Sequence, residues 1–280
     1  MKEYLTHEFS ADDPELISVI DELPLWAAPF GLRLLDLMKI KNKMKALDIG
    51  CGLGFPLIEV AQRLGNSSKV YGIDPWEAAL QRAKQKIGKY KIKNVEVIKG
   101  FAEDIPFENS YFDLIISNNG INNVEDLDKT ISECARVCKP GAQFVFTMNL
   151  ENSMKEFYNV FEETLTKNKM LTEIDKMKKH IHEKRRPIDE IKNLLDEYGF
   201  LIDNIVYDKF YLRFADAYTL FNHSLIKYWF LSSWKQIIPE KDLESIFVEL
   251  ESKLNEIAAK DGEIKLTIPF AAVDAQKKRE

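Results

Sequence analysis

The sequence predicts an α/β fold built on a doubly wound, Rossmann-like parallel sheet. From Lys45 onward, short and continuously apolar runs alternate with segments whose apolar residues recur at helical spacing. Runs of this kind are typical of strands buried on both faces of a parallel sheet. Their alternation with helices gives βαβ units, which place helices on both faces of such a sheet. The five apolar runs are Ala46–Ile49, Val70–Ile73, Val95–Ile98, Leu114–Ile116 and Phe144–Met148.

Helices are expected before the first strand and before the fifth. The stretch Pro14–Met38 has helical character, with a break at residues 23–26, where the sequence reads Leu-Pro-Leu-Trp. Apolar residues of Leu127–Cys138 recur at helical spacing, and Pro140-Gly141 is expected to end that helix before the next strand. The region after the fifth strand is less regular. Its expected elements are one or two helices over 154–183, a helix from Pro187 to Gly199, a strand over 200–214, helices over 215–261 and a strand over 264–272.

Composition and charge restrict the classes of partner and site. The chain has 280 residues, with 39 Lys and Arg against 45 Asp and Glu, and its formal net charge of -6 argues against a nucleic-acid partner. No segment reaches the roughly 18 consecutive apolar residues of a membrane helix, and Met1–Asp13 lacks the apolar core of a signal peptide, so we expect a cytoplasmic protein without a membrane partner. Three cysteines make a disulfide framework improbable. Cys134 and Cys138 lack neighbouring ligands, so we expect no metal and interpret both as core residues.

A glycine-rich loop follows the first predicted strand. The sequence Asp48-Ile-Gly50-Cys-Gly52-Leu-Gly54 leads directly into a helix. Glycines at the end of a first strand allow a sharp turn and let a ligand touch the backbone. Asp74 stands at the end of the second strand, where a carboxylate can accept hydrogen bonds from both ribose hydroxyls of an adenosine. Position 55 is Phe rather than the glycine that a dinucleotide motif requires.

These motifs resemble the class I S-adenosylmethionine-dependent methyltransferases. The resemblance covers Ala46–Met148, with ALDIGCGLG, YGIDPWEAAL, GFAEDIPFENSYFDLIISNNGINNV and ECARVCKPGAQFVF in the family's order. Within the class, the chain is most similar to the small-molecule branch that includes the menaquinone and ubiquinone biosynthesis methyltransferases. The resemblance implies a seven-stranded sheet with an antiparallel last strand, which would make 200–214 the sixth strand and 264–272 the seventh.

The implied cofactor is S-adenosyl-L-methionine, with S-adenosyl-L-homocysteine as product. The resemblance implies that Gly50, Gly52 and Gly54 pass its methionine portion, that Asp48 supports the loop and that Asp74 holds the ribose. Pro75 and Trp76 would cover the adenine, and Ala102 and Glu103 match the segment that reads the adenine edge. Because Phe101 replaces a common acidic residue there, the adenine amine would be met by Glu103 or by backbone alone. Ser117, at the end of the fourth strand, completes the cofactor set.

The whole chain is interpreted as a single methyltransferase domain over residues 1–280. The two late strands, separated by a long helical segment, favour one sheet with an insertion over two domains. The expected parts are an N-terminal helical segment (1–42), the cofactor-binding core (43–149), helices (150–198), late strands (199–214 and 263–276) and a helical cap insertion (215–262).

Candidate substrate residues come from the strand end and from the extra helices. Ligands bind beyond the carboxyl ends of strands in such sheets, and four asparagines follow the fourth strand. Asn119 and Asn122 are the preferred substrate contacts, the alternative being loop capping. Trp26 and Phe30 either line a lid or pack the N-terminal helices. His223 is a candidate general base, with a hydrogen-bonded core histidine as the alternative.

A basic run precedes the late strands. Residues 167–186 carry eight Lys and Arg against three Asp and Glu. Such runs usually form a solvated helix face. The alternative is that Lys184, Arg185 and Arg186 recognise an anionic substrate.

The function expected from this set is methyl transfer to a small molecule by in-line displacement. Such a transfer mainly requires alignment of a nucleophile and exclusion of water, so no catalytic residue is mandatory. Two alternatives stay open: a cofactor-binding sensor or interaction module without catalysis, and a protein methyltransferase. The substrate, the accepting atom and the oligomeric state are not fixed by the sequence.

Overall fold

The computed structural model describes residues 2–22 and 25–279 and has the predicted α/β architecture. Its seven-stranded sheet has the order β3-β2-β1-β4-β5-β7-β6. Strands β1 to β5 pair in parallel, and β7 runs antiparallel to β5. The predicted sheet of seven strands with an antiparallel last strand is therefore confirmed. The strands are β1 (Lys45–Ile49), β2 (Lys69–Asp74), β3 (Val95–Lys99), β4 (Phe112–Asn118), β5 (Cys138–Asn149), β6 (Phe200–Phe214) and β7 (Ile264–Lys277).

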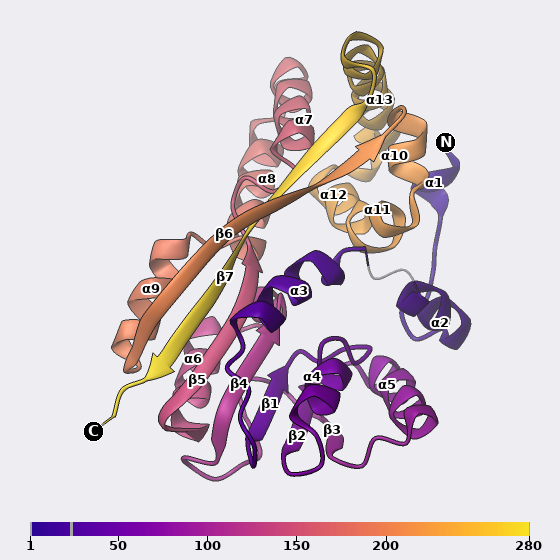
Figure 1. Cartoon of the computed structure of the whole chain (residues 1–280). Coiled ribbons are helices and arrows are strands. Elements are labelled where there is room, and N and C mark those ends of the chain that lie inside the picture. The colour runs from indigo at the N-terminus through magenta and orange to yellow at the C-terminus, as the bar shows by residue number, and fades with distance from the viewer. Residues whose placement is uncertain (1, 23–24, 280) are drawn as a thin grey trace. The chain divides into compact units, whose positions relative to one another are not determined.

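Helices occupy the segments between the strands (Figure 1). The first part of the chain contains α1 (Glu3–Thr6), α2 (Pro14–Glu22), α3 (Ala27–Leu37), α4 (Leu57–Leu64), α5 (Glu77–Tyr90), the 3-10 helix η1 (Ile121–Asn123) and α6 (Leu127–Val137). The second part contains α7 (Lys155–Lys167), α8 (Leu171–Lys184), α9 (Ile188–Glu197), α10 (Ala217–Asn222), α11 (Ser224–Trp229), α12 (Leu231–Ile237) and α13 (Glu240–Asp261).

One element boundary differs from the expectation, and the break expected within Pro14–Met38 lies where it was predicted. Helix α6 ends at Val137, because Cys138 already has extended backbone angles and begins β5, so Pro140-Gly141 lies inside the strand segment. Helix α2 ends at Glu22 and α3 begins at Ala27, while two residues of the expected break, 23 and 24, lie outside the described residues.

The chain divides into two compact units. Unit 1 consists of Met1–Ser10, Leu150–Arg185 and Lys209–Pro269, and unit 2 of Ala11–Asn149, Arg186–Asp208 and Phe270–Glu280. The predicted N-terminal segment and both late strands therefore contribute residues to both units. A single methyltransferase domain over residues 1–280, with its helical cap, stays a prediction.

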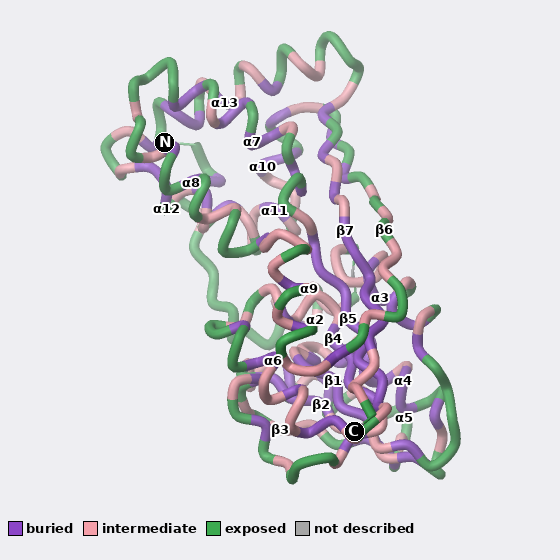
Figure 2. Tube along the Cα trace, turned by 90° about the vertical axis from the view of Figure 1, so that its left-hand side faces the viewer, coloured by how far each residue is buried: buried purple, intermediate pink, exposed green. Residues whose placement is uncertain are grey.

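Unit 2 contains the sheet core and its covering helices. Figure 2 shows α3, α4 and α5 on one face of β1 and β4 and α6 on the other. The buried face of α4, with Leu57, Val60 and Leu64, packs on strand residues such as Val70 and Leu114. Burial of both sheet faces explains why these strands read as continuous apolar runs.

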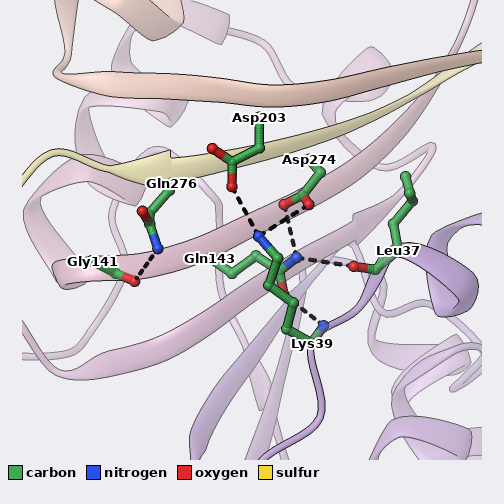
Figure 3. A network of polar contacts seen from close by, with 7 residues as sticks. All are labelled: Leu37, Lys39, Gly141, Gln143, Asp203, Asp274 and Gln276. Carbon is green, nitrogen blue, oxygen red and sulfur yellow. Dashed lines mark hydrogen bonds and ion pairs between the residues drawn. The ribbon is translucent and has the colours of Figure 1, made fainter.

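A polar network inside unit 2 fixes the segment between α3 and β1. The Gln143 side chain, 5% exposed, accepts a hydrogen bond from the Lys39 N–H at 2.9 Å and donates to Leu37 O at 3.0 Å and to Asp274 Oδ1 at 2.7 Å (Figure 3). The Lys39 ammonium lies 2.8 Å from Asp203 Oδ2 and 3.3 Å from Asp274 Oδ2. One buried amide thus links α3, β5 and β7.

Unit 1 has an aromatic core. Phe157 of α7 stacks on Trp234 of α12 with ring centroids 3.9 Å apart, and Tyr4 of α1 stacks on Phe221 of α10 at 5.0 Å. All these side chains are buried. The predicted helical insertion therefore forms four helices, α10 to α13, that share a core with α1 and α7.

Three observations concern the cysteines, possible metal ligands and possible membrane spans. Cys51, Cys134 and Cys138 are free and buried, which confirms the core interpretation of Cys134 and Cys138. In the described part of the chain, no cluster of three or more His, Cys, Asp or Glu residues is arranged to hold a metal ion. No described helix combines the length and the apolar character needed to cross a bilayer.

Candidate functional site

The glycine loop connects β1 to α4 in a conformation that depends on glycine. Gly50, Gly52 and Gly54 have φ angles of +71°, +46° and +98°. Residues with a Cβ rarely adopt this left-handed region. The loop is closed by hydrogen bonds from the N–H groups of Gly50 and Cys51 to Ile73 O, at 2.9 and 3.2 Å, so it follows the end of β2.

The three glycines meet different surroundings. A Cβ at Gly50 would lie 3.0 Å from the Cα of Gly120, and one at Gly54 would lie 2.9 Å from Ile58 Cδ1. A Cβ at Gly52 would meet only the Asp74 carboxylate, at 4.0 Å. The protein itself thus packs closely around Gly50 and Gly54, whereas Gly52 borders open space beside an acid.

Asp74 lies against this open space at the end of β2. Its carboxylate accepts hydrogen bonds from the N–H groups of Gly52 and Trp76, each at 2.8 Å, and the residue is 9% exposed. Burial raises the pKa of Asp74, and the two backbone donors act in the opposite direction. Each oxygen accepts one backbone hydrogen bond and keeps acceptor capacity for a further donor.

Asp48 is the most unusual group of the site. It is fully buried on β1, and neither carboxylate oxygen has a hydrogen-bond partner among the described residues. Burial, and then the charge of Asp74, raise the pKa of Asp48 well above its usual range, with the nearby Leu57 N–H acting in the opposite direction. A buried carboxyl of this kind is strongly stabilised by a cation or a donor brought to it.

The end of β4 packs on the start of the loop. The Ser117 hydroxyl donates a hydrogen bond to Ile49 O at 2.9 Å. A Cβ at Gly120 would lie 2.6 Å from the same carbonyl oxygen, so only glycine fits at this approach. The sequence interpretation included Ser117 but not Gly120. The feature that could have indicated Gly120 is its position next to the asparagines at the strand end.

The segment expected to read adenine has two distinct side chains. Ala102 is buried, but the Glu103 carboxylate accepts hydrogen bonds from the N–H groups of Glu125 and Asp126, at 2.8 and 3.1 Å. Glu103 therefore also caps the turn before α6, whose N-cap is Asp126. Pro75 and Trp76 follow Asp74, and Trp76 is the N-cap of α5.

The asparagines at the end of β4 form a side-chain network. Asn122 Nδ2 donates to the Oδ1 atoms of Asn119 and Asn149, and the Asn149 N–H donates to Asn119 Oδ1 at 3.2 Å. Asn118 donates to Ala27 O at 3.1 Å. The proposed substrate contacts Asn119 and Asn122 thus come together, and loop capping accounts for part of their bonding. The sequence interpretation did not include Asn149. The feature that could have indicated it is its position at the end of β5, beside β4.

The aromatic and histidine candidates occupy different parts of the molecule. Trp26 precedes α3, with its ring 5.4 Å from that of Phe30. Phe30 is fully buried and lies 4.8 Å from Phe270. His223 belongs to unit 1, where its ring lies edge-on to Phe214 at 5.3 Å. Burial lowers the pKa of His223, and its buried Nδ1 has no partner in the described part of the chain.

Comparison with known proteins agrees with this geometry. The family model described as "Methyltransferase domain" matches residues 40–199, more than half of the chain. The chain belongs to this methyltransferase family. The predicted family and fold class are thereby confirmed.

The relatives share only part of their length with this chain. A demethylmenaquinone methyltransferase of Bacillus mycoides (strain KBAB4) is 38% identical over 109 residues, which is 39% of this chain and 46% of that protein. The chain thus spans about half the length of the curated relatives it matches.

Solved structures extend the likeness over most of the chain. The YcgJ protein of Bacillus subtilis has a TM-score of 0.60 at 16% identity and covers 90% of this chain and 99% of its own. A SAM-dependent methyltransferase from Aquifex aeolicus has a TM-score of 0.52 at 24% identity, covering 71% of this chain and 93% of its own. At these identities the likeness concerns the fold.

Proposed function

We propose that this methyltransferase transfers the methyl group of S-adenosylmethionine to a small molecule by in-line displacement. The observation that carries the proposal is the juxtaposition of a glycine without steric neighbours, the buried carboxylate of Asp74 and the unpartnered carboxyl of Asp48. These groups stand at the carboxyl ends of β1 and β2, where such sheets bind nucleotides.

The residues fit the cofactor chemically. Asp48 would pair with the ammonium of the methionine portion, which would supply the counter-charge that its buried carboxyl lacks. Gly52 would let the cofactor approach the backbone. The acceptor capacity that remains on Asp74 suits the two ribose hydroxyls, and Pro75, Trp76, Ala102, Glu103 and Ser117 are the remaining proposed contacts.

When bound, the cofactor supplies an electrophilic methyl group on a sulfonium. The chain's own residues would bind and orient the acceptor and exclude water, since in-line transfer depends mainly on alignment. Asn119 and Asn122 are the proposed acceptor contacts in unit 2, with Trp26 and Phe30 as aromatic candidates. A base is needed only for a protonated acceptor, and His223, held neutral by burial, remains the candidate for that role.

The relatives, the net charge and the cysteines bear on the substrate class and the location. The relatives named demethylmenaquinone methyltransferases support a small-molecule acceptor. The net charge of -6 supports the absence of a nucleic-acid partner, and three free buried cysteines support a reducing, cytoplasmic location.

Calorimetric titration with S-adenosylhomocysteine tests the cofactor site. We expect Asp74→Ala to weaken binding by at least about tenfold, because two hydrogen bonds to a charged acceptor are lost. The control is Asp189→Ala, an exposed unit 2 aspartate whose ion pair among the described residues is with Lys192. Absence of binding to the unmodified protein, or equal binding by both variants, would refute the proposal.

A second measurement separates the enzyme from a sensor. Incubation of the protein with methyl-labelled cofactor and a small-molecule extract is expected to give a labelled small product. Cofactor binding without a labelled product would favour the sensor, and label on protein would favour a protein methyltransferase.

A further inference from the structure

The basic run that follows α7 contains one cation unlike the others. Five of its members form ion pairs near the surface: Lys167 with Glu249, Lys176 with Glu173, Lys178 with Glu162, Lys179 with Glu183 and Arg186 with Glu190. Arg185 is only 2% exposed, and no carboxylate of the described residues lies within 4.0 Å of it. Most of the run is the solvated face that such sequences predict, and Arg185 is the exception.

Arg185 is held by one aromatic residue. Its guanidinium lies 5.0 Å from the ring centroid of Tyr158, and Nη1 donates a long hydrogen bond of 3.3 Å to the Tyr158 hydroxyl. The buried Nε–H has no acceptor in the described part of the chain. Cation–π stacking and one neutral hydrogen bond do not replace the hydration that a buried guanidinium loses.

Tyr158 adds a second unsatisfied donor. Its hydroxyl oxygen accepts hydrogen bonds from Arg185 and from Trp234 Nε1, the latter at 3.0 Å, and its own O–H meets no acceptor among the described residues. Trp234 is fully buried and fixed by its stacking on Phe157. The Tyr158 oxygen is therefore held in place, with its proton available to a further oxygen.

Arg136 of α6 provides an internal contrast. Its guanidinium donates to the Glu133 carboxylate at 2.6 Å and to the carbonyl oxygens of Ile105 and Phe107, at 2.8 and 2.7 Å. The guanidinium of Arg136, which has a structural role, thus finds all its hydrogen-bond acceptors within the protein. Arg185 is more deeply buried and has none of these acceptors.

The neighbouring histidine adds no charge beside Arg185 near pH 7. Burial, followed by the charges of Arg185 and Lys184, lowers the pKa of His180 to about 4. His180 is therefore neutral near pH 7 and supplies no counter-charge. An oxyanion beside Arg185 would meet one full positive charge and two fixed donors.

We propose that Arg185 and Tyr158 form an oxyanion-binding site in unit 1, for a small molecule that carries a carboxylate or a phosphate. The guanidinium Nε–H and the Tyr158 O–H are the donors that the anion would engage. Of the three basic residues singled out in the sequence, Lys184, Arg185 and Arg186, only Arg185 has this arrangement.

Thermal unfolding in inorganic phosphate, in benzoate and in chloride at equal ionic strength tests this site. We expect phosphate, benzoate or both to raise the Tm of the unmodified protein by at least about 2 °C over chloride, and the stronger probe identifies the anion class. Arg185→Met should remove this rise, Tyr158→Phe should reduce it, and the neighbouring control Arg186→Met should retain it.

Two outcomes would overturn the site. The first is an equal rise in Tm with anion in the unmodified protein and in Arg185→Met. The second is no rise in Tm with either anion, together with a loss of stability in Arg185→Met. If Arg185→Met does not fold, the NMR resonance of the Arg185 Nε–H is followed while the anion is added to the unmodified protein. This resonance is assigned by its absence from the spectrum of Arg185→Lys. An unmoved resonance refutes the site. Because anion binding is measured without cofactor, its result is independent of S-adenosylhomocysteine binding.

Discussion

Two acids at adjacent strand ends have different surroundings and therefore different roles. Asp74 accepts two backbone hydrogen bonds, from Gly52 and Trp76, that hold its carboxylate in a fixed position. Asp48 has no such partners among the described residues and is fully buried. Asp74 thus holds the loop through its own backbone hydrogen bonds, whereas the role that we propose for Asp48 is to pair with the ammonium of the cofactor.

Asp48→Asn tests this difference. Since burial raises the pKa of Asp48, its ionised form destabilises the folded state as pH rises, and the neutral amide removes that cost. We expect the variant to be at least as stable as the unmodified protein in urea unfolding near pH 8. Its dissociation constant for S-adenosylhomocysteine should rise by about tenfold, because the charged partner of the ammonium is lost. Unchanged affinity would contradict the role given to Asp48.

Gly52→Ala separates ligand access from backbone strain. Its φ of +46° makes an added Cβ unfavourable by about 1 kcal/mol, and Gly262, with φ +83° and nothing within 4 Å, provides the matched Gly262→Ala control. Both variants should lose similar stability, but only Gly52→Ala should lose S-adenosylhomocysteine affinity. Equal affinity in the two variants would show that the cofactor does not approach Gly52.

At the scale of elements, the Gln143 amide connects the end of α3 to β5 and β7. Gln143→Ala would leave the Lys39 N–H, the Leu37 carbonyl and Asp274 Oδ1 without their partner, and we expect a loss of about 2–4 kcal/mol in unfolding free energy. Gln276→Ala, which removes only a 3.1 Å bond to Gly141 O, should cost about 1 kcal/mol or less. A loss in Gln143→Ala no larger than in Gln276→Ala would show that the Gln143 hydrogen bonds do not help to hold α3 on the sheet.

The sequence predicts the central elements because each is specified locally. The apolar runs, the glycine loop and Asp74 depend on chain neighbours, and β1, β2 and the loop between β1 and α4 follow the expectation. Local patterns place Asn149 and Gly120 at strand ends, but the contacts of Asn149 with Asn122 and of Gly120 with Ile49 depend on the β1–β4–β5 alignment. The burial of Arg185, inside a run whose other cations are exposed or form ion pairs, is likewise visible only from the fold.

At the scale of the whole molecule, the buried histidines and the two acids of the candidate cofactor site lie in different units and respond oppositely to acid. All four histidines lie in unit 1, and burial is the largest cause of the lowered pKa values of His7, His180 and His223. Unit 2 contains Asp48 and Asp74, whose pKa values burial raises. A lowered histidine pKa means that stability is lost as pH falls, whereas a raised carboxyl pKa means that stability is gained.

Hydrogen exchange followed by mass spectrometry should reveal this asymmetry. Between about pH 6.5 and pH 4, His180 binds a proton in the unfolded chain but not in the folded chain, because its pKa in the folded state is about 4. We therefore expect unit 1 peptides, and α8 first, to lose protection at a higher pH than the β1–β4 peptides of unit 2, after correction for the intrinsic pH dependence of exchange. In His180→Gln, which cannot take up this proton, the loss in unit 1 should begin at lower pH. Simultaneous loss in both units, or an unchanged profile in His180→Gln, would mean that burial of His180 does not limit the acid stability of unit 1.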